Sequence, residues 1–296
     1  MRILNLGCGV QSTAVFLLAH EGRIAHIDHA IFADTQEEPD AVYRHLAWLK
    51  TVPAPVPIIH VGTAGRIGDD LARGVNTTGQ RFATIPAFTA PGEPNADYKK
   101  LLIGCKRKIG KHRRQCTKEY KTQVVERIIR REIFHLAPRE RFMKGVVIDQ
   151  LFGISLDEKS RAERITKRFE SIKWARPRFP LIDLKWTRKD CKDFLKPRVP
   201  HEVPRSACVF CPFKSASEWL LTKQDPKAWA RAVEVDEALR RPGAIVQRGM
   251  NQPLYVHRSA VPLAMVDLDK EAAKERERKR MPLFELMECG EGMCGL

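Results

Sequence analysis

The sequence lacks an apolar run of the length that a membrane-spanning helix needs, about 18 to 20 residues. It also lacks a secretory signal, because the apolar start, residues 1–6, is short and is soon interrupted by two glycines. Apolar residues nevertheless make up 43% of the 296 residues, which is enough to bury a core. We therefore expect a soluble, cytoplasmic protein with no membrane partner. The sequence does not indicate an oligomeric state.

Without a secretory signal, disulfides are not the default use of the eight cysteines. The Cys208-Val209-Phe210-Cys211 segment has the spacing of a metal or cluster chelate. Cys116 follows Arg113 and Arg114, and neighbouring cations favour the thiolate form of a cysteine. These thiols are therefore candidate metal ligands, with a redox pair or free thiols as the alternative.

Acidic residues are scarce between Lys99 and Arg131, where thirteen lysines or arginines stand against two glutamates. The whole chain has a formal net charge of +16. An excess of this kind favours an anionic partner, with nucleic acid or nucleotides first. The candidate contacts of nucleic acid or another anion are Arg113, Arg114, Lys118 and Lys121. The alternative is a chain that is basic without such a partner.

Short apolar segments alternate with helical ones in the first part of the chain. The pattern predicts strands at residues 2–6, 28–32 and 56–61, and one at 145–148 that continues toward 153–154. It predicts helices at 11–20, from Pro39 onward, at 117–133 and at 187–195. Strands and helices that alternate with short links predict a doubly wound, mostly parallel α/β sheet with helices on both faces. We expect this domain to span residues 1–196. Residues 197–296 are expected to form a smaller helical part with the CxxC pair and a cysteine-containing tail.

The segment from Gly7 to Thr13 is the first candidate anion site. A strand runs into Gly7 and Gly9, and Gln11, Ser12 and Thr13 then open a helix. Glycines let backbone N–H groups approach a phosphate, and a helix N-terminus adds favourable partial charge. The segment has neither the third glycine of the dinucleotide fingerprint nor the lysine of the Walker loop. A tight strand-to-helix turn without a ligand is the alternative.

Two further segments follow predicted strands. Asp34 and Thr35 end the second strand, where a carboxylate can accept from a ribose hydroxyl, although a helix-capping aspartate is the alternative. Gly153 and Arg161 bound a loop after a later strand, and the arginine could face a phosphate.

The order of these motifs resembles the phosphoadenosine phosphosulfate reductase-like family of the PP-loop (adenine nucleotide α-hydrolase-like) superfamily over nearly the whole chain. The residues that carry the resemblance are Gly7 to Ser12; Asp34, Thr35, Pro39 and Tyr43; Arg114, Cys116 and Lys121; Gly153 and Arg161; Pro180, Leu181, Trp186 and Thr187; Cys208 and Cys211; and Glu288, Cys289 and Gly290. The sequence departs from the family pattern at Gly7, at Gln11, where an acidic residue is usual, and at Gln115, where a second cysteine is usual.

The resemblance implies that ATP or a related adenine nucleotide binds, with Mg²⁺ as a candidate companion. It implies a [4Fe–4S] cluster on Cys116, Cys208 and Cys211, with zinc as the alternative. Cys294 is then the candidate fourth ligand and Cys289 the candidate catalytic thiol, and the reverse assignment of these two stays open.

The resemblance, the thiols and the basic stretch together favour an enzyme of the PP-loop ATP pyrophosphatase type. Its expected activity is ATP-dependent sulfur modification of nucleic acid, with a sulfur donor or a thiol reductant protein as a partner. One alternative is a phosphoadenosine phosphosulfate (sulfonucleotide) reductase in which Cys289 attacks the sulfur. The other is a non-catalytic, zinc-stapled nucleic-acid-binding protein.

Overall fold

The computed structural model describes residues 1–53, 56–62, 65–75, 85–90, 109–112, 114–241 and 252–280. Contacts within the chain divide it into two compact units. The first comprises residues 1–67 and 115–208, and the second comprises residues 68–114 and 209–296. The sequence pattern predicts one boundary after residue 196, whereas the contacts also assign an internal segment to the second unit. That segment has no apolar periodicity from which its partners could be read.

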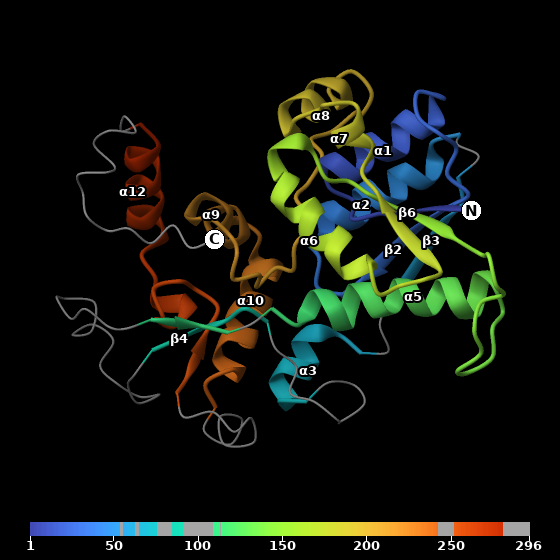
Figure 1. The fold of residues 1–296 in the computed structure, drawn as a ribbon. Helices are drawn as coiled ribbons and strands as arrows, with labels where there is room; N and C mark the ends of the chain where they lie inside the picture. The colour runs from blue at the N-terminus through green and yellow to red at the C-terminus, as the bar shows by residue number, and fades with distance from the viewer. Residues whose placement is uncertain are drawn as a thin grey trace. The chain divides into compact units, whose positions relative to one another are not determined.

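A five-stranded parallel sheet forms the centre of the first unit (Figure 1). Its strands are β1 (Arg2–Asn5), β2 (His29–Asp34), β3 (Ile58–Gly62), β6 (Ile148–Phe152) and β7 (Ala175–Arg178). They are ordered β3-β2-β1-β6-β7. The prediction of a doubly wound α/β sheet is confirmed.

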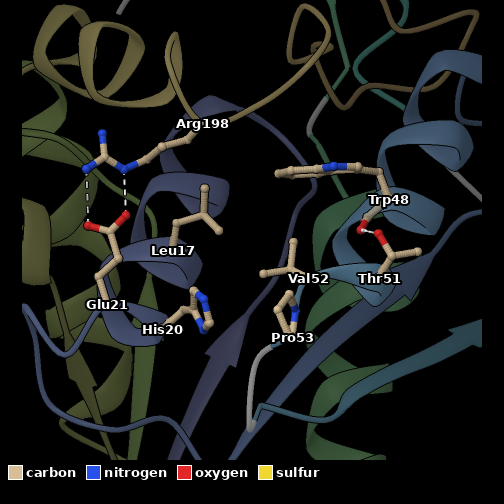
Figure 2. A pocket seen from close by; sticks show the side chains of 8 residues that line it. All are labelled: Leu17, His20, Glu21, Trp48, Thr51, Val52, Pro53 and Arg198. Carbon is tan, nitrogen blue, oxygen red and sulfur yellow. Dashed lines mark hydrogen bonds and ion pairs between the residues drawn. The ribbon is translucent and has the colours of Figure 1, made fainter.

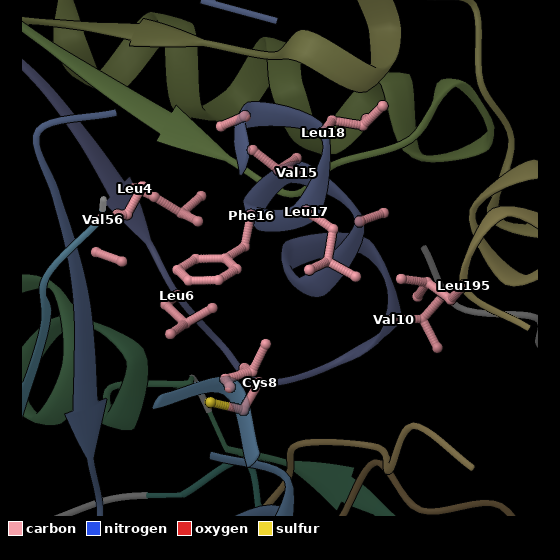
Figure 3. Close-up of a cluster of buried hydrophobic side chains, with 14 of the residues drawn as sticks. Leu4, Leu6, Cys8, Val10, Val15, Phe16, Leu17, Leu18, Val56 and Leu195 are labelled. Carbon is pink, nitrogen blue, oxygen red and sulfur yellow. The ribbon is translucent and has the colours of Figure 1, made fainter. Parts of the chain in front are cut away.

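One face of this sheet is covered by α1 (Val10–His20), α2 (Asp40–Thr51), α7 (Pro180–Asp183) and α8 (Arg188–Leu195). Leu4 and Phe32 turn to this face and join an apolar cluster with Phe16 and Leu46, part of which is drawn in Figure 3. Burial of side chains of this size stabilises a fold by about 1.5–3 kcal/mol each. The cluster therefore holds α1, and with it the loop before α1, firmly against the sheet.

The opposite face is covered by a helical run composed of η1 (Lys118–Thr122), α5 (Gln123–Ile128) and η2 (Ile129–Ile133). Ile3 and Ile31 precede Leu4 and Phe32 in their strands, and their side chains point to the opposite face. Successive side chains of a strand point to opposite faces of the sheet. Helix α6 (Lys159–Phe169) follows a short turn, η3 (Leu156–Glu158). Arg168 of α6 donates to Thr122 at 3.1 Å, which places the two helices side by side. Helices thus cover both faces, as predicted.

Two helices begin where the sequence predicts, after a proline or a capping threonine. Pro39 precedes α2, where the sequence predicts a helix to open. Thr187 caps α8, because its hydroxyl accepts from the backbone N–H of Asp190 at 3.3 Å while the Asp190 carboxylate accepts from the Thr187 N–H at 2.8 Å. A capping residue of this kind is worth about 1 kcal/mol. The predicted cap and helix are confirmed.

The second unit is mostly helical. Its elements are α3 (Ile67–Arg73), α9 (Ala216–Gln224), α10 (Pro226–Ala238), η4 (Leu263–Met265), α12 (Leu268–Arg280), and three two-residue strands, β4 (Phe88–Thr89), β5 (Gly110–Lys111) and β8 (Leu254–Tyr255). The strands pair antiparallel in the order β5-β4-β8. The sequence predicts a helical part here but not this sheet, because two residues are too few for an alternating pattern.

The sequence also gives no signal for β7. Its residues are Ala-Arg-Pro-Arg, which have neither apolar alternation nor a run of branched side chains. Among the described strands, β7 pairs with β6 alone, at the edge of the sheet, where Pro177 is tolerated. Across the described ranges, no helix combines the length and apolar character needed to cross a membrane.

Candidate functional site

The loop from Leu6 to Gly9 leaves the carboxyl end of β1 and enters α1. The chain continues from β1 to β2 on one side, whereas β6 is added on the other side of β1. The carboxyl ends of β1 and β6 therefore form a topological switch point, which is where open α/β sheets bind ligands. Gly7 to Thr13 and Gly153, both predicted from sequence, meet at this edge.

Ser12 holds the loop in shape. Its hydroxyl accepts from the backbone N–H groups of Gly7 and Gly9, each at 3.2 Å, and lies 3.2 Å from the Gly9 carbonyl. The predicted phosphate contact of the Ser12 hydroxyl thus has internal partners in this structure. Between the glycines, Cys8 has a φ of 54°, a left-handed conformation that costs a non-glycine residue about 1–2 kcal/mol. Burial, with a contribution from Glu38, raises the pKa of the Cys8 thiol, so this thiol stays protonated at neutral pH.

Gly7, Gly9 and Gly153 differ in the space that the protein leaves for a side chain. A Cβ on Gly153 would lie 2.5 Å from the backbone nitrogen of Ser12, so packing alone excludes a side chain there. A Cβ on Gly7 would come no closer than 3.7 Å to Ser12, and one on Gly9 no closer than 3.9 Å to Pro204 and Ser206. Gly9 also has an ordinary φ of −109°. The protein's own packing therefore explains Gly153 but not Gly7 or Gly9.

Gln11 joins three parts of the chain. Its side-chain amide donates to the Ser155 hydroxyl at 2.9 Å and to the Glu158 carboxylate, and its carbonyl accepts from Arg188 at 3.0 Å. Glu158 also accepts from Arg161 at 3.1 Å. Gln11 and Arg161, both predicted, therefore meet through Glu158. Glu158 and Arg188 were not predicted from the sequence, although Glu158 lies within the segment from Gly153 to Arg161 and Arg188 directly follows Thr187.

Thr13 faces away from the loop toward two histidines, of which His45 is buried and His201 is exposed. Its hydroxyl lies 2.9 Å from His45 Nε2, and His45 Nδ1 lies 2.9 Å from His201 Nε2. The Trp48 ring stacks on His45 at 5.5 Å. Burial, and next the neighbouring His201, lower the pKa of His45 to about 4. The sequence carries no local signal for this chain of contacts, because Thr13 and His201 lie far apart in it.

Asp34 and Thr35 lie at the end of β2, as predicted, and both are buried. One Asp34 oxygen accepts from the Gln36 N–H at 2.7 Å and from the Tyr43 hydroxyl at 3.1 Å, and the other lies 2.9 Å from His60 Nε2. Burial and the Asp34 charge raise the pKa of Tyr43, so its phenol remains a donor. A ribose hydroxyl would share Asp34 with these partners.

Two buried glutamates follow Asp34. Glu38 accepts from Lys121 at 3.2 Å and from the Ser206 hydroxyl at 3.2 Å. Glu37 pairs with Arg66 at 3.5 Å. Lys121, predicted as an anion contact, is thus held beside the Gly7 to Thr13 loop by a carboxylate. Glu37 and Glu38 were not predicted as site residues, although their position shortly after Asp34 and Thr35 could have indicated them.

Three of the predicted cluster ligands, Cys116, Cys208 and Cys211, lie among the described residues. Cys208 Sγ lies 3.3 Å from the Thr35 hydroxyl, and Cys116 is half-buried just before η1. Cys211 is half-buried in the second unit. Within the described ranges, no three histidine, cysteine or acidic side chains are grouped so that they could hold a metal ion. Cys289 and Cys294 lie outside the described residues, so the predicted four-sulfur site stays a prediction.

Of the predicted basic contacts, Lys118 is exposed in the first unit and Arg114 is exposed in the second. The Arg114 guanidinium lies 5.5 Å from the centre of the Phe213 ring. Arg113 lies outside the described residues.

A separate pocket of about 340 Å³ lies at the other end of α1 (Figure 2). Leu17, His20 and Trp48 line it, and Arg198 forms a two-point ion pair with Glu21 at 2.6 and 3.2 Å beside it. An eleven-residue helix is about 16 Å long, so this pocket is remote from the loop at the start of α1.

Comparison with known proteins does not assign this chain to a family. No family, curated protein or solved structure gives a significant match to this chain.

Proposed function

We propose that the first unit binds an adenine nucleotide with its phosphates on the Gly7 to Thr13 loop, and that the chain is an ATP-dependent enzyme of sulfur transfer to nucleic acid. The observation that carries the nucleotide part is the unexplained pair of glycines at the switch point. Gly7 and Gly9 are half-exposed and have room for a methyl group in the protein alone. A ligand that approaches the backbone closely supplies the missing reason for glycine at both positions.

The loop offers amides rather than hydroxyls to a phosphate. The first N–H groups of α1 have no carbonyl one turn earlier to bond, and they carry the positive end of the helix dipole. The hydroxyls of Ser12 and Thr13 already have partners within the protein. The N–H groups of Gly7 and Gly9 also have a partner, the Ser12 hydroxyl. The proposal therefore assigns the phosphates to the first N–H groups of α1, with Gly7 and Gly9 giving the phosphates room to approach.

Cations lie on both sides of this loop. Arg188 donates to Gln11, and Arg161 pairs with Glu158, which accepts from Gln11. Lys121, paired with Glu38, lies close enough to Cys8 to act on its thiol electrostatically. These three cations would offset the charge of a polyphosphate. Asp34, at the neighbouring strand end, would orient the nucleoside.

The sulfur part of the proposal is supported by the half-buried Cys116 and Cys208 in the same unit, and by the hydroxyl contact of Cys208 with Thr35. The nucleic-acid part is supported by the net charge of +16.

The test is ATP binding by isothermal titration calorimetry on the parent, Gly9→Ala and Gly22→Ala proteins. A methyl group on Gly9 fits the protein alone but occupies the space that a phosphate would use. We expect Gly9→Ala to bind at least 10-fold more weakly, about 1.4 kcal/mol. Its free energy of unfolding should fall by no more than about 1 kcal/mol, because Gly9 is the N-cap of α1, where alanine is a poorer cap than glycine. Gly22→Ala is the control for loss of stability: its methyl group enters open space, but the φ of 68° at Gly22 costs an alanine about 1–2 kcal/mol, so this variant should be less stable and still bind ATP like the parent. Equal affinity in the parent and Gly9→Ala, or no affinity of the parent for ATP, ADP or a sulfonucleotide, would overturn the proposal.

A further inference from the structure

The second unit carries an exposed aromatic ring with two cations over it. Phe213 is 38% exposed, which is unusual for a side chain of its size. The Lys111 ammonium lies 4.1 Å from the centre of its ring, and the Arg114 guanidinium lies 5.5 Å from it. Neither cation has an acidic partner among the residues that the structure describes. The charge of this cluster, Lys111, Arg114 and Phe213, is therefore uncompensated by the described part of the protein.

The cluster is built on fixed backbone. Lys111 lies in β5 directly opposite Phe88 of β4, and its ammonium is 5.9 Å from the Phe88 ring. Phe213 lies in a turn closed by a hydrogen bond from the Lys214 N–H to the Cys211 carbonyl at 3.1 Å. Ser215 then caps α9, and its own N–H donates to Glu218 at 2.8 Å. The ring and Lys111 are thus positioned by backbone pairing and capping before any partner arrives, which lowers the entropic cost of binding.

The chemistry of this cluster fits one class of ligand. An exposed ring offers a stacking surface to any nucleobase, because every base has a π-face. Flanking lysine and arginine side chains offer charge to the phosphates on either side of that base. A duplex hides its base faces within the stack, so it could use the cations but not the ring. A contact with a single strand could use both.

We propose that Phe213, Lys111 and Arg114 form a stacking platform for an unpaired base of single-stranded nucleic acid. This inference rests on the proposed function, in that it names the form of nucleic acid that the enzyme would act on. It assigns the base to Phe213 and the adjoining phosphates to Lys111 and Arg114.

The experiment is fluorescence anisotropy of the full chain with labelled 12-nucleotide single strands of DNA and RNA, and with the corresponding DNA duplex. We expect Phe213→Leu to weaken single-strand binding by about 5- to 100-fold and Phe213→Trp to restore it, since stacking depends on an aromatic face. Duplex affinity should change less than twofold in Phe213→Leu. Leu221→Ala, an exposed apolar residue on α9, is the control and should bind like the parent.

The salt dependence tests the two cations. Replacing Lys111 and Arg114 together by alanine should reduce the slope of log affinity against log salt by about 1.4 for a single strand, since two phosphate contacts are lost. A preference between DNA and RNA in the parent would identify which strand the platform serves. Unchanged single-strand affinity in Phe213→Leu, an equal loss with duplex, or no binding by the parent would overturn the platform.

The nucleotide site and the stacking platform can be refuted independently of each other. Phe213→Leu should bind ATP like the parent, because Phe213 has no part in the Gly7 to Thr13 loop. Loss of strand binding with intact ATP binding supports the platform, whereas absence of ATP binding by the parent refutes only the nucleotide site.

Discussion

His45 should make the stability of this protein fall in mild acid. It is fully buried, and its pKa drops from 6.5 to about 4 in the fold. Between these two values the unfolded chain binds a proton at His45 and the folded protein does not. Acid therefore favours the unfolded state, and stability rises again as the pH increases through this range. Linkage gives a loss of about 2 kcal/mol at pH 5 relative to pH 7.5, approaching about 3 kcal/mol near pH 4.

The groups that face His45 support this sign. They are the Thr13 hydroxyl, the His201 ring and the Trp48 ring, none of which carries a negative charge that would stabilise a charged imidazole. A proton on His45 would also put donors on both ring nitrogens. We therefore expect His45 to stay neutral down to about pH 4.

The assay is urea denaturation followed by tryptophan fluorescence at pH 7.5 and pH 5, for the parent, His45→Gln and His26→Gln. Glutamine does not titrate, so His45→Gln should lose about 2 kcal/mol less between the two pH values than the parent does. A constant destabilisation from the substitution cancels in this difference. His26 has a side chain that is 57% exposed, so His26→Gln should follow the parent. If His45→Gln loses as much stability as the parent, the reasoning is refuted.

Two further substitutions test packing and buried charge. Gly153→Ala should cost about 1–3 kcal/mol in urea denaturation and weaken ATP binding, since its Cβ would lie 2.5 Å from the Ser12 nitrogen; parent-like stability would contradict this contact. Asp236→Ala should lower the free energy of unfolding by about 3–5 kcal/mol, measured by thermal or urea unfolding. The substitution leaves the buried Arg240 without its carboxylate, and it leaves two backbone N–H groups, which donate to Asp236 at 2.8 and 2.9 Å, without an acceptor. A loss under 1 kcal/mol would show that these donors find other partners.

The elements that the sequence predicts correctly are those with a local physical cause. Alternating apolar residues and short links indicate the parallel sheet, and Thr187 with Asp190 indicates the start of α8. The position of the Gly7 to Thr13 loop could be predicted because an apolar strand followed by glycines and hydroxyl residues is typical of a strand-to-helix turn. Strand β7 was missed because its pairing with β6 is not encoded by its own four residues.

The roles within the site could not be read in the same way. Ser12 and Thr13 look alike in sequence as phosphate contacts, yet one hydroxyl shapes the loop and the other meets His45. Gln11 stands where an acid is usual in the family that the sequence resembles, and in the fold it bonds to Glu158. Only the tertiary structure brings a carboxylate to that position.

The sequence by itself determined that a parallel sheet forms with helices on both faces, without its edge strand β7, and it determined the position of the glycine loop. Short-range periodicity and backbone freedom are properties of neighbouring residues. The tertiary structure alone decided that Gly153 is required by packing while Gly7 and Gly9 are not. It alone brought Lys111 and Arg114 to Phe213, about a hundred residues away along the chain. These contacts join segments whose meeting depends on the whole fold, and no local pattern encodes such a meeting.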